Sequence, residues 1–202
     1  MKSALISETT TVIQPKVIPA KRVKPTFQTV ADFEKWQSKR KSDYNYEFYY
    51  GEIIKKQPMK QLEFLIVKFL TRWFTKTAAY KAEAELLAEA DSYVDEFRKR
   101  IPDLALFSLE EMKKAQKGEK IQTAFAIEIL SDSESLQHIE NKIQDYFDAG
   151  VLTVWYINPK TKKIYVYTSP TDVKIYFGNM VVNAQPALSD FEFPVNQLFD
   201  VE

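Results

Sequence analysis

The sequence predicts an α/β fold in which a central mixed β-sheet is flanked by helices. Short apolar runs typical of buried strands alternate with segments whose apolar residues recur every three or four positions, as on one face of a helix. In addition, residues 123–157 read as strand, helix and strand, and this order implies a right-handed parallel crossover within one sheet. Alternating segments near the C-terminus add hairpin strands, so the sheet is expected to be mixed.

The N-terminal half is predicted to form a helix, a hairpin and a second helix. Thr29 can cap the first helix, which runs through about Lys41 with an apolar side facing the core. Residues 46–54 are typical of two short strands around a glycine turn. A longer helix is predicted for residues 60–75, because their apolar positions repeat at helical spacing. Residues 78–90 are compatible with either a helix or a strand.

The C-terminal half is predicted to supply most of the sheet. Strands are expected at residues 101–107, 123–130, 151–157, 162–168 and 173–177, the last two as a hairpin towards the sheet edge. A solvated helix and loop should connect the first two of these strands. Ser131 can cap the helix that follows the second, with Glu134 at the reciprocal position of a capping box and Gly150 as the terminator.

The composition bounds the class of protein. The 202 residues fit one domain over residues 26–202, after a loose N-terminal tail at residues 1–25. The 28 basic and 28 acidic residues cancel, so any nucleic-acid surface must be a local patch. No apolar run is long enough to span a bilayer. Neither a membrane partner nor a small-molecule organic cofactor is expected.

The usage of cysteine and histidine restricts the chemistry further. The absence of cysteine excludes disulfides, thiolate zinc sites and a cysteine nucleophile, and it suits a cytoplasmic protein. His138 is the single histidine, so a zinc site built from several imidazoles cannot form within one chain. Abundant carboxylates instead favour hard cations with oxygen ligands, such as Mg²⁺ or Mn²⁺.

Two carboxylates stand within predicted strands, where an ionised acid is costly unless it is paired, hydrogen-bonded or bound to a metal. Strand parity puts Asp103 on one face with Ala105, and Glu128 on one face with Ala126, so each acid has room beside it. Two neighbouring strands can then place both acids on one divalent cation, with the backbone carbonyl of Ile129 as a third oxygen ligand. The alternative is that Asp103 ends a turn and Glu128 is a paired buried acid.

Lys142 lies on the helix after the Glu128 strand, at the border of the buried face. Ile139 is three positions before it and Tyr146 is four positions after it. From there the ammonium can reach the end of the sheet, where it can orient an attacking water or offset charge on a phosphate. Periodicity alone favours the alternative, a lysine that extends to solvent.

Several segments together form a fairly specific pattern, although none is specific alone. They are Phe27–Val30, the Tyr-Glu…Gly-Glu hairpin Tyr46–Glu52, the Pro-Asp strand Ile101–Ala105, the segment Glu128–Ser133, the helical residues Lys142 and Tyr146, and the strand and turn Val154–Pro159. In order and spacing, residues 27–200 resemble the Uma-type family of "putative restriction endonucleases", a branch of the PD-(D/E)xK nuclease superfamily.

The resemblance implies a restriction-endonuclease-like core and a nuclease site. Asp103 and Glu128 would be the ligands of a Mg²⁺ or Mn²⁺ ion. Lys142 would be the lysine that has moved from strand to helix, because Leu130 stands where the superfamily usually has it. Glu47, from the Tyr-Glu pair, would be a possible additional acid, with a surface acid as its alternative. The implied function is metal-dependent hydrolysis of phosphodiester bonds in nucleic acid, with DNA as the expected substrate.

Two departures from the family pattern keep other functions open. His138 stands where many relatives have an acid, and Glu63 stands where many have a histidine. A catalytically decayed nuclease fold that binds nucleic acid or protein is therefore the main alternative. A structural homodimer joined by the aromatic C-terminal hairpin is another.

Two further expectations concern partners. Cutting both strands of a duplex with one site per chain predicts a homodimer. The basic run Arg98–Arg100, which leads into the Asp103 strand, is a candidate contact for DNA, although most basic runs are simply solvated faces.

Overall fold

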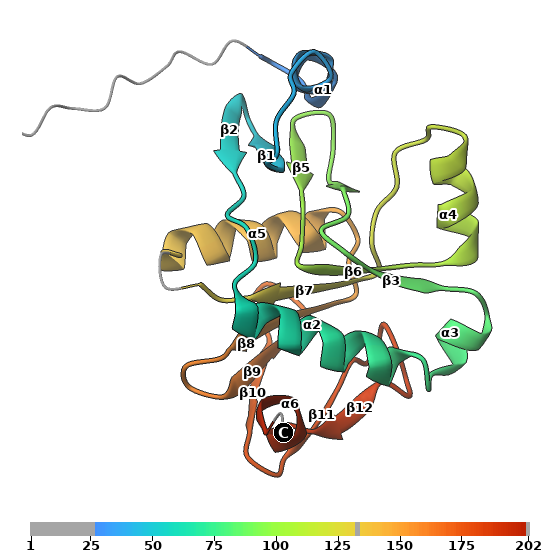
Figure 1. Cartoon of the computed structure of the whole chain (residues 1–202), viewed down its shortest axis with the longest axis vertical. Helices are drawn as coiled ribbons and strands as arrows, with labels where there is room; N and C mark the ends of the chain where they lie inside the picture. The colour runs from blue at the N-terminus through green and yellow to red at the C-terminus, as the bar shows by residue number, and fades with distance from the viewer. Residues whose placement is uncertain (1–26, 132–133, 201–202) are drawn as a thin grey trace, which may run out of the picture.

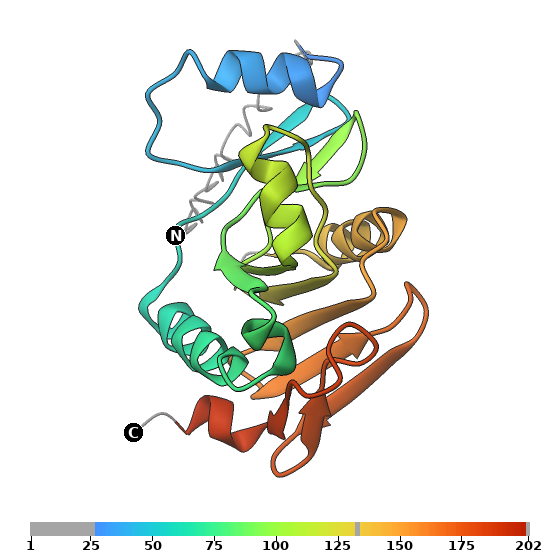
Figure 2. The same ribbon diagram turned by 90° about the vertical axis from the view of Figure 1, so that its right-hand side faces the viewer.

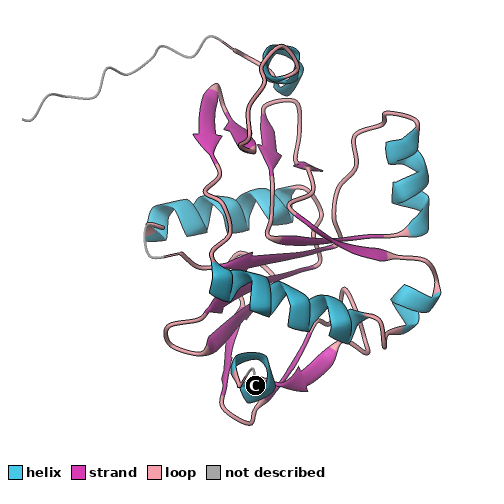
Figure 3. Ribbon diagram, in the orientation of Figure 1, coloured by secondary structure: helices cyan, strands magenta, loops and turns pink. Residues whose placement is uncertain are grey.

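The structure is a computed structural model that describes residues 27–131 and 134–200. The expected tail at residues 1–25 lies outside the described residues, as do Asp132 and Ser133. In Figure 1 the central sheet is seen nearly edge-on, with one long helix along each side, and Figure 3 shows the same arrangement by type of element. Within the described ranges, no helix is long and apolar enough to cross a bilayer.

The central sheet has six strands in the order β10-β9-β8-β7-β6-β3. They are β3 (Glu85–Ala88), β6 (Leu104–Phe107), β7 (Phe125–Ile129), β8 (Thr153–Asn158), β9 (Lys163–Tyr167) and β10 (Val173–Phe177). Strands β7 and β8 are parallel and the other neighbours are antiparallel. The predicted mixed sheet, its parallel pair and its C-terminal edge hairpin are therefore confirmed.

A second, antiparallel sheet lies at one end of the molecule, in the order β2-β1-β5-β4. Its strands are β1 (Tyr46–Tyr49), β2 (Glu52–Lys55), β4 (Ser92–Tyr93) and β5 (Arg98–Arg100). Figure 2 shows α1 (Val30–Gln37) across this sheet, and the C-terminal β12 (Glu192–Pro194) and α6 (Asn196–Phe199) at the opposite end. Strand β11 (Val181–Asn183) pairs with β12.

The two faces of the central sheet are covered by different helices because strand side chains alternate. On one face, Leu104 and Ile127 join a large core with α2 (Gln61–Phe74). On the other face, Ala126 packs against Ile143 and Tyr146 of α5 (Leu136–Asp148). Helix α5 connects the parallel strands β7 and β8, and it lies on the face that carries the small residues.

Local signals explain most helix boundaries. Thr29 caps α1 as predicted by accepting a hydrogen bond from the N–H of Asp32. Helix α1 ends at Gln37, four residues before the predicted Lys41, because the following residues are polar and bury nothing. Helix α4 (Leu109–Gln116) starts with a capping box between Ser108 and its third residue.

Three further differences from the sequence prediction affect how the elements connect. The ambiguous residues 78–90 contain both elements, a short helix α3 (Ala78–Lys81) followed by β3. Helix α5 is capped by Ser135, whose side chain accepts from the N–H of His138, so the predicted cap at Ser131 is wrong. The chain before Ser131 is still extended, because the N–H of Leu130 pairs with β8.

The third difference bears directly on the site. The predicted strand 101–107 begins only at Leu104, and the three residues before it carry the chain from β5 of the second sheet to β6 of the central sheet. This three-residue segment, Ile101–Asp103, is called the crossing segment below. It brings the two sheets together at Asp103.

Candidate active site

A cavity of about 780 Å³ opens where the second sheet, the central sheet and α5 meet. Its lining includes every site residue predicted from the sequence, namely Glu47, Asp103, Glu128, Ile129 and Lys142. It also includes further charged or polar side chains, among them Lys55, Lys56, Lys60, Glu63, Glu134 and His138. The fold therefore gathers carboxylates and ammonium groups from both sheets and α5.

Asp103 and Glu128 face each other across two neighbouring strands. Ala105 of β6 pairs with Ala126 of β7, and Leu104 pairs with Ile127. One further step of this register places Asp103 opposite Glu128, on the same face as the two alanines. Residues directly opposite each other have Cβ atoms about 5 Å apart. Asp103 precedes the strand proper, as the turn alternative supposed, yet its side chain lines the cavity beside Glu128.

Both carboxylate oxygens of Asp103 accept a hydrogen bond. Its Oδ1 lies 2.8 Å from the Nζ of Lys56, and its Oδ2 lies 2.6 Å from the backbone nitrogen of Ile129. The Lys56 ammonium donates a second bond, of 2.7 Å, to the carbonyl of Ile101. Ile129, which was expected to contribute its carbonyl to a metal, contributes its N–H to Asp103.

Glu128 is almost fully buried, with 2% of its surface exposed. Its Oε2 lies 3.1 Å from the Nζ of Lys142, and its Oε1 accepts a hydrogen bond from the hydroxyl of Tyr146. Burial raises the pKa of Glu128 to about 7, and the negative charges of Asp103 and Glu47 act in the same direction. The opposing attraction of nearby lysine ammonium groups is outweighed.

Lys142 points into the cavity, so the alternative of a lysine extended to solvent is wrong. Its side chain is 8% exposed, and its Nζ lies 3.1 Å from Glu128, 3.5 Å from Glu134 and 3.7 Å from Glu47. Burial alone would lower the pKa of Lys142, but these carboxylates raise it above its ordinary value. The ammonium is therefore a permanent positive charge in the cavity.

Glu47 is the second buried glutamate of the cavity. Its Oε2 lies 3.0 Å from Nη1 of Arg100, and its Oε1 accepts from the backbone N–H of Ile101 at 3.1 Å. Burial alone would raise the pKa of Glu47, but the positive charges of Lys142, Arg100 and Lys56, together with this N–H, lower it to about 2. The alternative of a surface acid is wrong.

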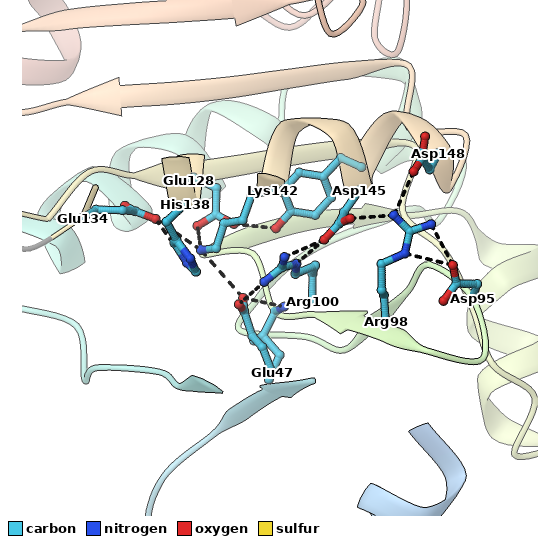
Figure 4. Close-up of polar contacts among 12 residues, drawn as sticks. Glu47, Asp95, Arg98, Arg100, Glu128, Glu134, His138, Lys142, Asp145 and Asp148 are labelled. Atoms are coloured by element: carbon cyan, nitrogen blue, oxygen red, sulfur yellow. Dashed lines mark hydrogen bonds and ion pairs between the residues drawn. The ribbon is translucent and has the colours of Figure 1, made fainter. Parts of the chain in front are cut away.

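Arg98 and Arg100 are turned into the protein, where they bind acids of α5. Arg100 reaches Oδ2 of Asp145 through Nε at 2.7 Å and Nη2 at 2.5 Å. Arg98 binds Asp145, Asp148 and Asp95 at 2.6–2.9 Å. Figure 4 shows this group, called the arginine clamp below, continuing the row of charges along α5. Lys99 between them is 2% exposed, so the prediction that Arg98–Arg100 contact DNA is wrong.

The residues that depart from the family pattern also have definite places. His138 lies on α5 at the cavity, where its Nε2 is 3.8 Å from Glu134, and burial together with Lys142 lowers its pKa. Glu63 accepts a hydrogen bond from the N–H of Lys60 at the start of α2. Leu130 packs beside α5 and supplies no charge.

Sequence reasoning missed three members of this network. Lys56 follows the exposed Lys55, and the alternation of an extended chain turns its side chain to the opposite side. Arg100 was assigned to a surface. The position of Asp145 could have indicated a buried ion pair, because it is an acid three residues after Lys142 and directly before the buried Tyr146.

The donor set fits a hard divalent cation. Two carboxylates face each other on one wall of a cavity, and oxygen is the ligand that Mg²⁺ and Mn²⁺ prefer. In the described part of the chain, each of these carboxylate oxygens accepts one hydrogen bond, whereas an ionised carboxylate has about four lone-pair sites, so acceptor capacity remains. Among the described residues, no three acid or histidine side chains form a complete metal cage. Asp103 and Glu128 would therefore hold such an ion as a pair.

The fold and the cavity define an α/β protein of the restriction-endonuclease-like class. The structure is similar to a crystal structure titled as "a putative nuclease belonging to DUF820" from Anabaena variabilis, with 18% identity and a TM-score of 0.70 over 82% of this chain and 96% of that chain. The model of the Uma2 family, described as "putative restriction endonuclease", matches residues 30–196. The chain therefore belongs to the Uma2 family, and the resemblance seen in the sequence is confirmed.

Two further comparisons add little. A cryoEM structure of a DrdV–DNA complex has 14% identity and a TM-score of 0.34 over 67% of this chain and 11% of that chain, a likeness too low to carry an argument. No match is found among curated proteins.

Proposed function

We propose that this protein hydrolyses phosphodiester bonds of DNA with a Mg²⁺ or Mn²⁺ ion held by Asp103 and Glu128. Membership of a family described as "putative restriction endonuclease" supports a nuclease. The observation that carries the proposal is the pairing of Asp103 with Glu128 in one cavity, with the Lys142 ammonium beside them. The carbonyl of Ile129 is the proposed third oxygen ligand.

When bound, the divalent ion would supply Lewis acidity, which lowers the pKa of a water and neutralises charge on the phosphate. Asp103 and Glu128 would hold it through their carboxylate oxygens. Water molecules would complete the coordination, as is usual for Mg²⁺. The Asp103 oxygens are oriented by the Ile129 N–H, and the Glu128 oxygens by Lys142 and Tyr146.

Lys142 is the proposed catalytic cation. Three carboxylates hold its ammonium at the cavity, and their negative charges raise its pKa above the ordinary value, which favours the protonated form. Its role is to neutralise charge that develops on the phosphate, or to orient the attacking water by donating a hydrogen bond. Glu47 is the positioning acid, because it contacts Lys142 and stays ionised.

A homodimer is the proposed assembly, because one cavity per chain cuts one strand of a duplex. The edge strand β10 supports this proposal. It exposes Val173, Ile175 and Phe177 along one row, at a sheet edge that pairs with no other strand within residues 27–131 and 134–200. Sedimentation equilibrium at micromolar concentration should give twice the mass of the 23.6 kDa chain. A monomer would leave only a nicking activity.

Cleavage of supercoiled plasmid tests the catalytic assignment. With Mg²⁺ or Mn²⁺, the wild type should nick and linearise the plasmid, and Lys142→Ala should lose on the order of 100-fold in rate, as for other groups that stabilise transition-state charge. Lys142→Arg should rescue poorly, because a planar guanidinium cannot replace a compact ammonium. Lys114→Ala, which removes a half-exposed lysine of α4, should cut like the wild type. Equal rates for Lys142→Ala and the wild type would refute the role of Lys142.

A binding module is the second candidate function. It is favoured by one observation, namely that Asp103 and Glu128 each already carry a lysine ammonium. If the wild type cuts neither DNA nor RNA with either metal, but binds DNA with an affinity that falls steeply with salt, this second function replaces the first.

A further inference from the structure

Lys56 is held at Asp103, one of the two acids proposed to bind the metal. It follows β2 directly, and its side chain is 11% exposed. The ammonium lies 2.8 Å from Oδ1 of Asp103 and 2.7 Å from the carbonyl of Ile101. Both partners belong to the crossing segment, so the second sheet supplies a cation to the acid of the central sheet.

The charges of the paired acids are balanced without any added ion. The Lys56 ammonium forms an ion pair with Asp103, and the Lys142 ammonium forms one with Glu128. A divalent ion coordinated by Asp103 would bring a double positive charge to within a few ångströms of the Lys56 ammonium. Two cations on one carboxylate oxygen repel each other, and more strongly in a partly buried site than in bulk water. Lys142 meets the same charge at Glu128, but its ammonium also contacts Glu47 and Glu134, which can hold it when an ion is bound.

A second cavity gives the Lys56 side chain another place to go. Lys56 and Gln57 line both the main cavity and an adjoining one of about 300 Å³. The smaller cavity carries two acids, Asp43 and Glu89. An ammonium that leaves Asp103 can therefore remain near carboxylates by rotating about the flexible lysine stem.

We propose that Lys56 is an intramolecular competitor of the divalent ion, which occupies Asp103 in the metal-free protein and must leave it before the ion can bind. This inference rests on the proposed function, because it concerns the same pair of acids. As a consequence, Lys56 continues to occupy Asp103 when the concentration of the divalent ion is low. The displaced ammonium then lies in the smaller cavity, near Asp43 and Glu89.

Isothermal titration with Mn²⁺ tests the competition. Lys56→Gln should bind Mn²⁺ about tenfold more tightly than the wild type, or better, which is the scale on which a neighbouring charge alters a binding equilibrium. Lys55→Gln is the matched control, because it removes the same charge one residue earlier, from an exposed lysine that lies over the ring of Tyr44. It should bind Mn²⁺ within about twofold of the wild type, the change left by an exposed, solvent-screened charge.

The outcomes separate this inference from the proposed function. If the wild type and Lys56→Gln bind Mn²⁺ equally well, or the variant binds more weakly, the competition is refuted while the metal site stands. If neither protein binds Mn²⁺ at millimolar concentration, while both remain folded by circular dichroism, the metal site itself is refuted and the inference falls with it.

A second measurement uses the wild-type protein and does not depend on a variant. Reductive methylation followed by peptide mass spectrometry reports how accessible each lysine is. Without metal, Lys56 should be protected relative to Lys55. Saturating Mg²⁺ should increase labelling of Lys56 several-fold and leave Lys55 unchanged. Protection of Lys56 that stays the same or increases with Mg²⁺ would overturn the proposal.

Discussion

Two groups of buried charges lie side by side along α5, and they are built in opposite ways. In the arginine clamp, planar guanidinium groups bind Asp145 and its neighbours at 2.5–2.9 Å. In the lysine centre, defined as Asp103 and Glu128 with Lys56 and Lys142, single ammonium groups bind carboxylates at 2.8–3.1 Å. The cavity lining contains the whole lysine centre and no member of the clamp.

The difference shows how one helix serves stability and chemistry at once. The guanidinium forks of the clamp use most of their donors on fixed carboxylates, so the clamp ties α5 to β5 and leaves no room for a ligand. An ammonium is a compact charge on a flexible stem, so each acid of the lysine centre keeps a side open to the cavity. Glu47 connects the two groups, because it contacts both Arg100 and Lys142.

Breaking the clamp should have the largest effect on stability. Arg100→Met removes the cation shared by Glu47 and Asp145, and both are nearly fully buried. Loss of one partner of a buried pair leaves uncompensated charge and should cost about 3–5 kcal/mol in the free energy of unfolding. Urea unfolding followed by circular dichroism measures this cost. A loss below about 1 kcal/mol would show that water reaches the clamp, as it does at exposed ion pairs.

Removing the shared acid should have an intermediate effect. The low pKa of Glu47 means that its charge stabilises the folded protein, because Lys142 and Arg100 favour the ionised form more than burial disfavours it. Glu47→Gln should therefore cost about 2 kcal/mol at pH 7, the scale of hydrogen bonds to a charged group. Glu52→Gln, an exposed glutamate on the same hairpin, should change stability by less than about 0.5 kcal/mol. Equal effects of the two substitutions would contradict the assignment.

Removing the Glu128 carboxylate should have the smallest effect on the free energy of unfolding. The sign of this effect should depend on pH. The pKa of Glu128 rises from an ordinary value of 4.5 to about 7 in the folded protein. Between these values the folded state binds more protons than the unfolded state, so this group lowers stability as pH rises from about 4.5 to about 7. Glu128→Gln should abolish this loss and be as stable as the wild type, or more stable, at pH 8.

Urea midpoints at pH 5 and pH 8, measured with EDTA, test the sign for Glu128. His138 has a lowered pKa and acts in the opposite direction, because its stabilising contribution grows as pH rises through its ordinary value of 6.5. The difference between the wild type and Glu128→Gln therefore isolates Glu128. Glu47 contributes little to this comparison, since its stabilisation is lost only as pH falls from 4.5 towards 2. A variant that is less stable than the wild type at pH 8 would contradict the prediction.

Local patterns were sufficient to predict the sheet, most helices and the facing acids. Helical spacing placed α2 within one residue at each end, and strand parity put Asp103 and Glu128 on one face. The helices depend on residues that are close in sequence. The facing acids depend on the pairing of β6 with β7, in which the small Ala105 lies opposite Ala126. The choice between Ser131 and Ser135 as helix cap was different, because it depends on how far β7 stays paired with β8.

The contacts made by residues of the second sheet could not be predicted from the sequence. Arg98 and Arg100 read as a surface patch because nothing near them in sequence shows that β5 pairs with β1, about fifty residues earlier. The same pairing places Glu47 and Lys56 at the cavity. Side-chain direction in such a strand depends on its distant partners, so a basic run can be buried when acids of another element meet it.

The crossing segment also limits how the chain can change in length. With only Ile101, Pro102 and Asp103 between β5 and β6, the position of each strand fixes the register of the other. One inserted residue would either move Asp103 to the opposite face of its strand, away from Glu128, or pull Arg100 out of the clamp. The loop after α4 is also restricted where it approaches β7, because residues 121–124 hydrogen-bond with β4 and β6. Its first residues, 117–119, are exposed. Natural insertions and deletions should therefore accumulate at residues 117–119 and be absent from the crossing segment.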